Sequence, residues 1–115
     1  MTTVNELQVG VATESNYVIV DMRDKSDYSD WHIIESYAFP LMMLNQDKTI
    51  PELHRFKNKE EKMIICYSND ERNGLAAANA MVDRGYENTF LLTGGIEKFI
   101  EEYPNLVEGA NVPKL

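Results

Sequence analysis

One continuous stretch, residues 62–85, constrains the fold most, because it reads as a strand, a loop and a helix in succession. Residues 62–67 contain an apolar run short enough to be a buried strand, and residues 68–74 contain no apolar side chain. From Leu75 good helix formers predominate, and Gly85 marks the expected C-terminal stop. A loop between a strand and a helix N-terminus gathers backbone N–H groups where the helix dipole favours negative charge. The stretch therefore predicts an anion-binding loop.

The rest of the sequence alternates expected strands and helices, which predicts an α/β fold. Three further apolar runs suggest buried strands, and polar or periodic segments between them suggest helices: strands at 17–20, 37–39 and 89–92, and helices at 27–31 after a capping Ser26, from 49–51 onward, and at 96–103. A weaker pattern suggests a short helix within residues 2–10. Such alternation predicts a parallel sheet of four to five strands with helices on both faces. We expect one domain over residues 1–104 and an extended tail over 105–115.

Charge and cysteine content exclude several classes of function. The chain has 115 residues and a formal net charge of −8, which argues against a nucleic-acid backbone or an anionic membrane surface as a partner. The sequence shows no membrane-spanning run and no signal peptide, and its single cysteine cannot form an internal disulfide. Its two histidines and one cysteine lack metal-site spacing, so we expect no metal and no cofactor. We expect a cytoplasmic protein.

Several short motifs, in the order in which they occur, resemble the rhodanese-like domain family. YVIVDMRD at 17–24, with Tyr28, HI at 32–33 and YAFP at 37–40, resembles the first half of such a domain. RGYENT at 84–89 and LTGG at 92–95 resemble motifs of its second half. The match covers roughly residues 15–103. The resemblance implies a rhodanese-like fold, in which active sulfurtransferases carry a cysteine at the start of the loop after the central strand.

The loop departs from that family pattern at its most important position. Aligned on the family motifs, the cysteine slot falls on Ser68. A serine hydroxyl stays protonated near neutral pH and cannot hold a persulfide, so on this alignment sulfur transfer is lost. The resemblance then implies a non-catalytic interaction or regulatory module.

A second alignment of the loop leaves an enzymatic alternative open. Cys66 and Arg72 have a C-x5-R spacing that resembles the loop of the cell-cycle dual-specificity phosphatases, although Ile65 stands where that family has a histidine. The resemblance implies Cys66 as nucleophile and Arg72 as the phosphate-gripping fork. An arsenate-reductase-like or thiosulfate sulfurtransferase activity of Cys66 belongs to the same alternative.

Strand length and charge favour the Ser68 alignment. With Ser68 at the slot, the central strand runs over residues 63–67, a common length, whereas a catalytic Cys66 leaves only three residues for it. Asp70 and Glu71 place two carboxylates in a loop that would receive an anion, and at about 6 Å such charges repel by roughly 1–3 kcal/mol. On this alignment Cys66 is a small buried apolar residue on a core strand.

The remaining candidate residues form two groups. The first is the predicted anion-binding loop, in which Asn73 is a candidate helix N-cap. In this loop Arg72 either binds an oxyanion or pairs with Asp70 or with a carboxylate at the end of the sheet, and we favour the pairing. The loop comprises Ser68, Asn69, Asp70, Glu71, Arg72 and Asn73. The second lines an expected crevice at the end of the first strand: Asp21, Arg23 and Trp31. For Asp21 and Arg23 we favour an ion pair that ties strand to loop over a catalytic role.

The loop and its flanking motifs most resemble one branch of the family. The Asp-Glu-Arg sequence of the loop, its missing cysteine and GYEN at 85–88 resemble the rhodanese domain of a centrosomal and ciliary protein family that is linked to tubulin glutamylation. That resemblance implies a protein partner, a place at the centrosome or cilium, and at most a small oxyanion in the loop. The acidic charge of the chain implies that any link to acidic tubulin is indirect.

Overall fold

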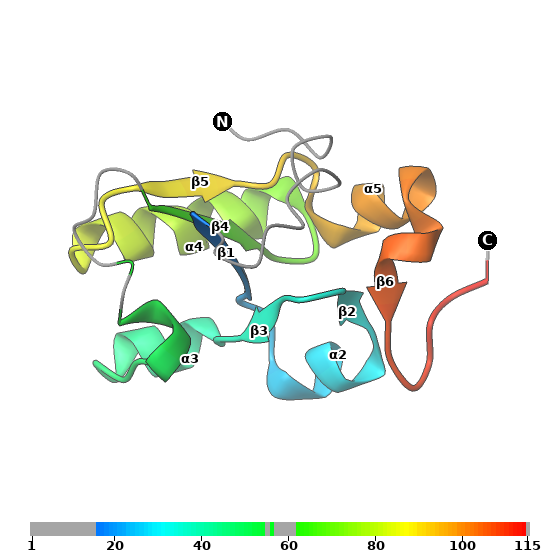
Figure 1. Ribbon diagram of the computed structural model, residues 1–115, viewed down its shortest axis with the longest axis horizontal. Coiled ribbons are helices and arrows are strands. Elements are labelled where there is room, and N and C mark those ends of the chain that lie inside the picture. Colours follow the sequence, from blue (N-terminus) through cyan, green and yellow to red (C-terminus); the bar gives the residue numbers. More distant parts are fainter. Residues whose placement is uncertain (1–15, 55, 57–61, 115) are drawn as a thin grey trace.

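A computed structural model describes residues 16–54, 56 and 62–114 of the chain (Figure 1). The elements follow one another in this order: β1 (Tyr17–Asp21), α2 (Lys25–Asp30), β2 (His32–Ile33), β3 (Tyr37–Ala38), α3 (Leu41–Asn45), the 3-10 helix η1 (Pro51–Leu53), β4 (Met63–Tyr67), α4 (Glu71–Asp83), β5 (Thr89–Leu91), α5 (Gly95–Glu102), the 3-10 helix η2 (Pro104–Leu106) and β6 (Val107–Glu108).

The main sheet has four parallel strands in the order β3-β1-β4-β5. β1 and β4 pair along their whole length, from Tyr17 opposite Met63 to Asp21 opposite Tyr67. Both are rich in β-branched residues, which pack well in a sheet covered on two sides. The prediction of an α/β fold with a parallel sheet is confirmed. The optional fifth strand and the short helix expected within residues 2–10 fall outside the described residues.

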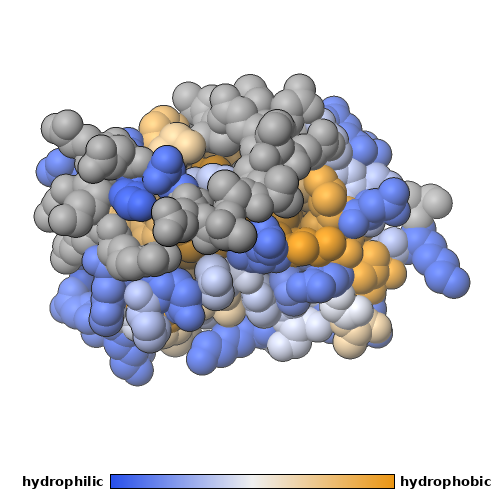
Figure 2. Space-filling view, viewed as in Figure 1, coloured by the Kyte–Doolittle hydropathy of each residue, from blue (hydrophilic) through white to orange (hydrophobic). Residues whose placement is uncertain are grey.

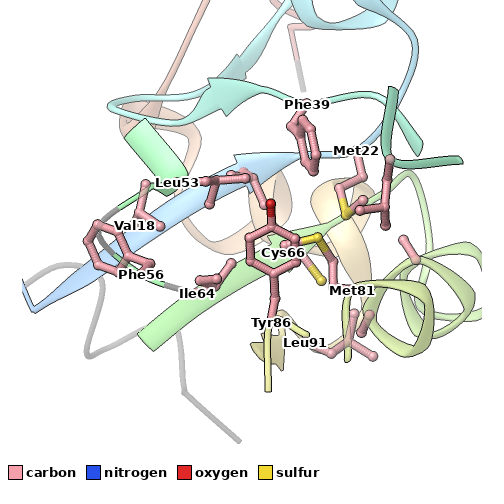
Figure 3. Close-up of a cluster of buried hydrophobic side chains, with 14 residues drawn as sticks. Val18, Met22, Phe39, Leu53, Phe56, Ile64, Cys66, Met81, Tyr86 and Leu91 are labelled. Carbon is pink, nitrogen blue, oxygen red and sulfur yellow. The ribbon is translucent and has the colours of Figure 1, made fainter. Parts of the chain in front are cut away.

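Helices cover both faces of this sheet, and the alternation of side chains along β4 divides the core between them. Ile64 and Cys66 point to one face, where they pack with buried residues of α3, η1 and α4 such as Leu53 and Met81; we call this group the first cluster (Figure 3). Ile65 and Tyr67 point to the other face, where they pack with buried residues of α5 and β6 such as Ile96; we call this group the second cluster. The prediction of helices on both faces is therefore confirmed.

Three local features differ from the sequence expectations. Helix α2 begins at Lys25 after Asp24 rather than being capped by Ser26, and neither end carries a side-chain cap. Residues 41–45, expected only to fill the core, form helix α3, and the helix expected from residue 49 is the short 3-10 helix η1. In α3 and η1, burial of Leu44 and Leu53 in the core overrides weak local propensity, whereas α2 buries no residue.

The C-terminal segment differs from the expected extended tail. β6 pairs antiparallel with β2, so that Val107 lies opposite Ile33 and is buried in the second cluster. Gly109 follows with a positive φ of 149°, and a Cβ there would lie 2.4 Å from the carbonyl oxygen of Asp30. Residues 107–109 are therefore packed against the domain, and a boundary at residue 104 remains a prediction. None of the helices in the described ranges is long and apolar enough to cross a membrane.

Candidate functional site

The candidate site lies where β1, β4 and β5 end at the same edge of the parallel sheet. The loop after β4 begins at Ser68, directly after Tyr67, and leads into α4. It is flanked by the chain after β1, where the amide of Met22 donates to the carbonyl of Tyr67 over 3.0 Å. On the other side, the amide of Leu92 after β5 donates to the carbonyl of Cys66 over 3.0 Å. Parallel sheets bind ligands at this edge, so the fold places the loop as the sequence predicts.

The first turn of α5 holds the loop from the second face of the sheet. The amides of Ile96 and Glu97 donate to the carbonyls of Ser68 and Asn69, at 3.0 and 3.2 Å. The contact requires glycine at position 95, because a Cβ there would lie 2.6 Å from the carbonyl oxygen of Asn69. The N-terminal amides of α5 are thus used to bind loop carbonyls, and they fix the path of the backbone.

The loop supplies its own carboxylates to two of the backbone amides at the site. Asp70 is the N-cap of α4, and its Oδ1 accepts from the amide of Asn73 over 2.9 Å and from the Asn73 side chain over 3.0 Å. Oε1 of Glu71 accepts from the amide of Gly94, after β5, over 3.2 Å. Asn73, the candidate N-cap, is therefore a donor to the cap rather than the cap itself.

Arg72 is exposed on the first turn of α4. Among the described residues, none of the ion pairs involves it, so the expected pairing with Asp70 is not present. The carboxylate of Asp70 accepts from Asn73 instead. A guanidinium on the outside of the helix faces solvent rather than an enclosed phosphate, and a role for Arg72 in binding an oxyanion stays a prediction.

Cys66 lies in the middle of the first cluster, on the strand before the loop (Figure 3). Its side chain has no solvent exposure, and it stands between Val20 of β1 and Leu91 of β5. Burial raises the pKa of the Cys66 thiol from 9.0 to about 12. The thiolate is the nucleophilic form of cysteine, so this environment opposes the C-x5-R alternative on two grounds, access and charge. The interpretation of Cys66 as a buried core residue on a strand of residues 63–67 is confirmed.

The two charged residues expected to line a crevice are instead a buried ion pair. Asp21 is fully buried, and Arg23 Nη2 lies 2.8 Å from Asp21 Oδ2, with Arg23 Nε 3.0 Å from Oδ1. Burial disfavours the charged guanidinium, but the hydrogen bonds and charge of Asp21 outweigh this and raise the pKa of Arg23. The expected ion pair is present, whereas the expectation that Asp21 and Arg23 line an open crevice is wrong, because both face the interior.

Arg23 also donates a hydrogen bond to the residue that precedes β2, and so fixes the start of that strand. Its Nη2 donates to the carbonyl of Trp31 over 2.5 Å, and the guanidinium carbon lies 5.6 Å from the centre of the Trp31 ring. Trp31 is half-buried and packs against the second cluster. Its position beside Arg23 supports a structural role for the indole, and a binding role stays a prediction.

Tyr67 and Ser36 complete this network, and sequence reasoning did not single them out. The Tyr67 hydroxyl donates to Asp21 Oδ2 over 2.7 Å, and it lies 3.2 Å from both the Ile33 amide and the Ser36 hydroxyl. Burial, followed by the charge of Asp21, raises the pKa of Tyr67, which keeps the phenol neutral. The only sequence signal was a tyrosine at the end of a strand that ends beside a charged motif. Across the described residues, no group of three or more His, Cys, Asp or Glu side chains could hold a metal ion.

Comparison with protein-family models identifies one family. The model of the rhodanese-like domain matches residues 3–102. Curated relatives include the centrosomal protein of 41 kDa from Danio rerio, 34% identical over 84% of this chain, and from Homo sapiens, 33% identical over 82%. These matches cover 26% of either relative, so the chain spans about a quarter of their length.

Solved structures have the same fold. The solution structure of the rhodanese-like domain of Alr3790 from Anabaena sp. has a TM-score of 0.74 and 20% identity, and the match covers all of this chain and 83% of that one. A human structure, the single-domain sulfurtransferase TSTD1, has a TM-score of 0.70 and 16% identity, over 89% of this chain and 96% of that one. At these identities the likeness concerns the fold alone.

Proposed function

The chain belongs to the rhodanese-like domain family, and from this premise we propose that it is a non-catalytic interaction module whose site edge binds a protein partner. The observation that carries the proposal is that the loop's own carboxylates already bind backbone amides at the site. Asp70 and Glu71 already accept from the amides of Asn73 and Gly94, and Ser68 stands at the cysteine slot. A sulfurtransferase needs a thiol at that slot and free backbone N–H groups to bind the anion, and the loop meets neither requirement.

Electrostatics supports the same proposal. A substrate anion at the loop would have to displace two carboxylates and would be repelled by them, at a cost of roughly 1–3 kcal/mol for each charge at about 6 Å. Displacing Asp70 would also remove the cap of α4, which is worth about 1 kcal/mol. A partner that offers N–H groups or cationic side chains meets neither obstacle. We therefore propose that the loop acts as an acidic recognition edge.

The names of the curated relatives suggest where such a module works. They are centrosomal proteins, and the chain corresponds to about a quarter of their length. We propose a cytoplasmic location at the centrosome or cilium, where the domain holds another protein. The partner is recognised in part through Glu71, which is exposed at the loop, and the net charge of −8 favours a basic or neutral surface.

Activity assays test the non-catalytic half of the proposal. We expect no sulfur transfer from thiosulfate to cyanide and no hydrolysis of an aryl phosphate above the buffer rate, for the wild type and for Cys66→Ser alike. A known active rhodanese and a known phosphatase serve as positive controls. Turnover by the wild type that Cys66→Ser abolishes would refute the proposal and revive the C-x5-R alternative.

A localisation experiment tests the binding half. A fluorescent fusion of the chain is expressed in ciliated cells and its enrichment at centrosomes is measured. We expect Glu71→Lys to reduce this enrichment. The control, Glu101→Lys, makes the same charge change at an exposed residue of α5 and should leave the enrichment unchanged. Enrichment that survives Glu71→Lys would exclude the loop as the recognition edge, and no enrichment of the wild type would count against the proposed location.

A further inference from the structure

Helix α4 carries exposed apolar side chains along one flank of its buried face. The inner face is buried through Gly74, Ala77, Ala78 and Met81. At 100° per residue, Leu75 and Val82 project about 90–110° from the middle of that buried face, and they are 52% and 44% exposed. They are seven residues apart, which on a helix of 3.6 residues per turn places them nearly above one another. A repeat of seven is the spacing with which helices pack in pairs.

Charged residues stand at the two ends of this apolar stripe. Arg72 lies one turn before Leu75 and Asp83 directly follows Val82, and both are exposed. Among the described residues, neither takes part in an ion pair. At 100° per residue, Arg72 and Asp83 project within about 20° of each other, on the same flank of the stripe. Asn79, also exposed, lies midway along it.

This arrangement is complementary to itself. When two copies of a helix pack antiparallel about a two-fold axis, the residues of one flank meet residues of the same flank from the opposite end. Leu75 of one copy then meets Val82 of the other, and Asn79 meets Asn79 at the centre. On the flank, Arg72 of each copy meets Asp83 of its partner. Because of the two-fold symmetry, the apolar contact and the ion pair each occur twice in the dimer.

We propose that α4 is a self-association surface, and that its occupant is the α4 of a second copy of this chain. The charge complementarity of Arg72 and Asp83 selects this occupant, since it requires an antiparallel pairing that the positions of Leu75 and Val82 also satisfy. The inference goes beyond the proposed function, because association through α4 does not depend on whether the loop is catalytic. Arg72 directly follows the loop carboxylate Glu71, so the test measures the oligomeric state and not binding at the centrosome.

The size of the surface sets the strength of the association. Helix α4 has 13 residues, so it is about 20 Å long. A single seam of this length buries less than the roughly 800 Å² per partner of standard interfaces. The dimer is therefore weak, and it is populated at high protein concentration or where a longer protein brings two copies together.

Charge exchange at the two ends tests the pairing. The sedimentation coefficient is measured from about 10 μM to 1 mM for the wild type, for Arg72→Asp, for Asp83→Arg, and for the variant that carries both changes. Each single change replaces two attractions by two repulsions, so we expect it to weaken the dimer by about tenfold or more. The double change restores opposite charges and restores the dimer. Mixing the two single variants forms a heterodimer, because each supplies the charge that the other lacks.

The variants are chosen so that they fold. Arg72→Asp adds a negative charge at the N-terminus of α4 and Asp83→Arg adds a positive charge at its C-terminus, and the helix dipole favours both. The matched control is Glu101→Arg, which changes the charge of an exposed residue of α5 and should leave the dimer unchanged. A wild type that stays monomeric up to 1 mM overturns the proposal. So does a dimer that the single changes do not weaken, or a double change that fails to restore association.

Discussion

The reactivity of Cys66 separates a core cysteine from a catalytic one, and its magnitude follows from the structure. Burial raises the pKa of the thiol from 9.0 to about 12. This increase of three units in the pKa lowers the fraction of Cys66 present as thiolate by about a thousandfold at any pH below 9. The side chain is also fully buried, so iodoacetamide cannot reach it in the folded protein. We therefore expect alkylation of folded Cys66 to be at least about a thousand times slower than that of the unfolded chain at pH 8.

The assay follows the mass of the intact protein with time between about pH 5 and 9, with and without urea. In urea the rate should increase with pH as for an ordinary thiol, with a midpoint near the unperturbed pKa of 9.0. In buffer the residual rate should fall when the protein is stabilised and rise when it is destabilised, because modification then passes through global opening. A fast reaction of the folded protein with a midpoint below pH 7 would refute the reasoning, since it requires an exposed thiolate.

Three further predictions concern stability. Tyr67→Phe removes the hydroxyl that binds Asp21 and should lower the free energy of unfolding by about 2–4 kcal/mol in urea titration; the exposed Tyr37→Phe is the control, and equal effects would contradict the network. Gly95→Ala forces a Cβ against loop backbone at a φ of 69° and should cost about 2 kcal/mol or more, whereas a neutral outcome would mean that α5 does not clamp the loop. Because the pKa of Cys66 is raised on folding, the stabilisation of its neutral thiol is complete below about pH 9 and is lost as pH rises toward 12. Wild type should therefore lose up to about 4 kcal/mol more than Cys66→Ala over that interval, and parallel pH profiles would rule this out.

The sequence predicts the sheet well, because the strands that build it are buried on both faces. A strand of that kind is a short apolar run with β-branched residues, as in β1 and β4, and it is recognisable without knowledge of its neighbours. The last helix is equally clear, because Ile96, Phe99 and Ile100 recur at helical spacing and are buried as expected. In these elements the local sequence pattern and the packing of the core call for the same apolar residues, so the elements can be predicted from the sequence.

Prediction is weaker where a residue serves a contact distant in sequence. β6 contains only two residues, and its pairing with β2 joins segments about 75 positions apart, which no local pattern records. The sequence predicts the ion pair of Asp21 and Arg23 but places it at an open crevice, whereas in the structure it is buried beneath Tyr67 and Trp31. The sequence suggests Asn73 as the cap of α4, whereas the cap is Asp70; both residue types suit a cap, and only the backbone path of the loop distinguishes them.

The polar residues of the loop are compatible with one another and with a loop that holds no anion. A loop that receives an anion must leave its amides open and must avoid carboxylates nearby, which costs stability in the unbound protein. On the alignment that places Ser68 at the cysteine slot, that requirement is absent, and Asp70 caps α4, which is worth about 1 kcal/mol. Glu71, in the first turn of the same helix, gains a few tenths of a kcal/mol or more from the helix dipole and also binds the amide of Gly94. We therefore expect that Ser68→Cys alone does not create an anion site, because the carboxylates of Asp70 and Glu71 still accept from the amides there.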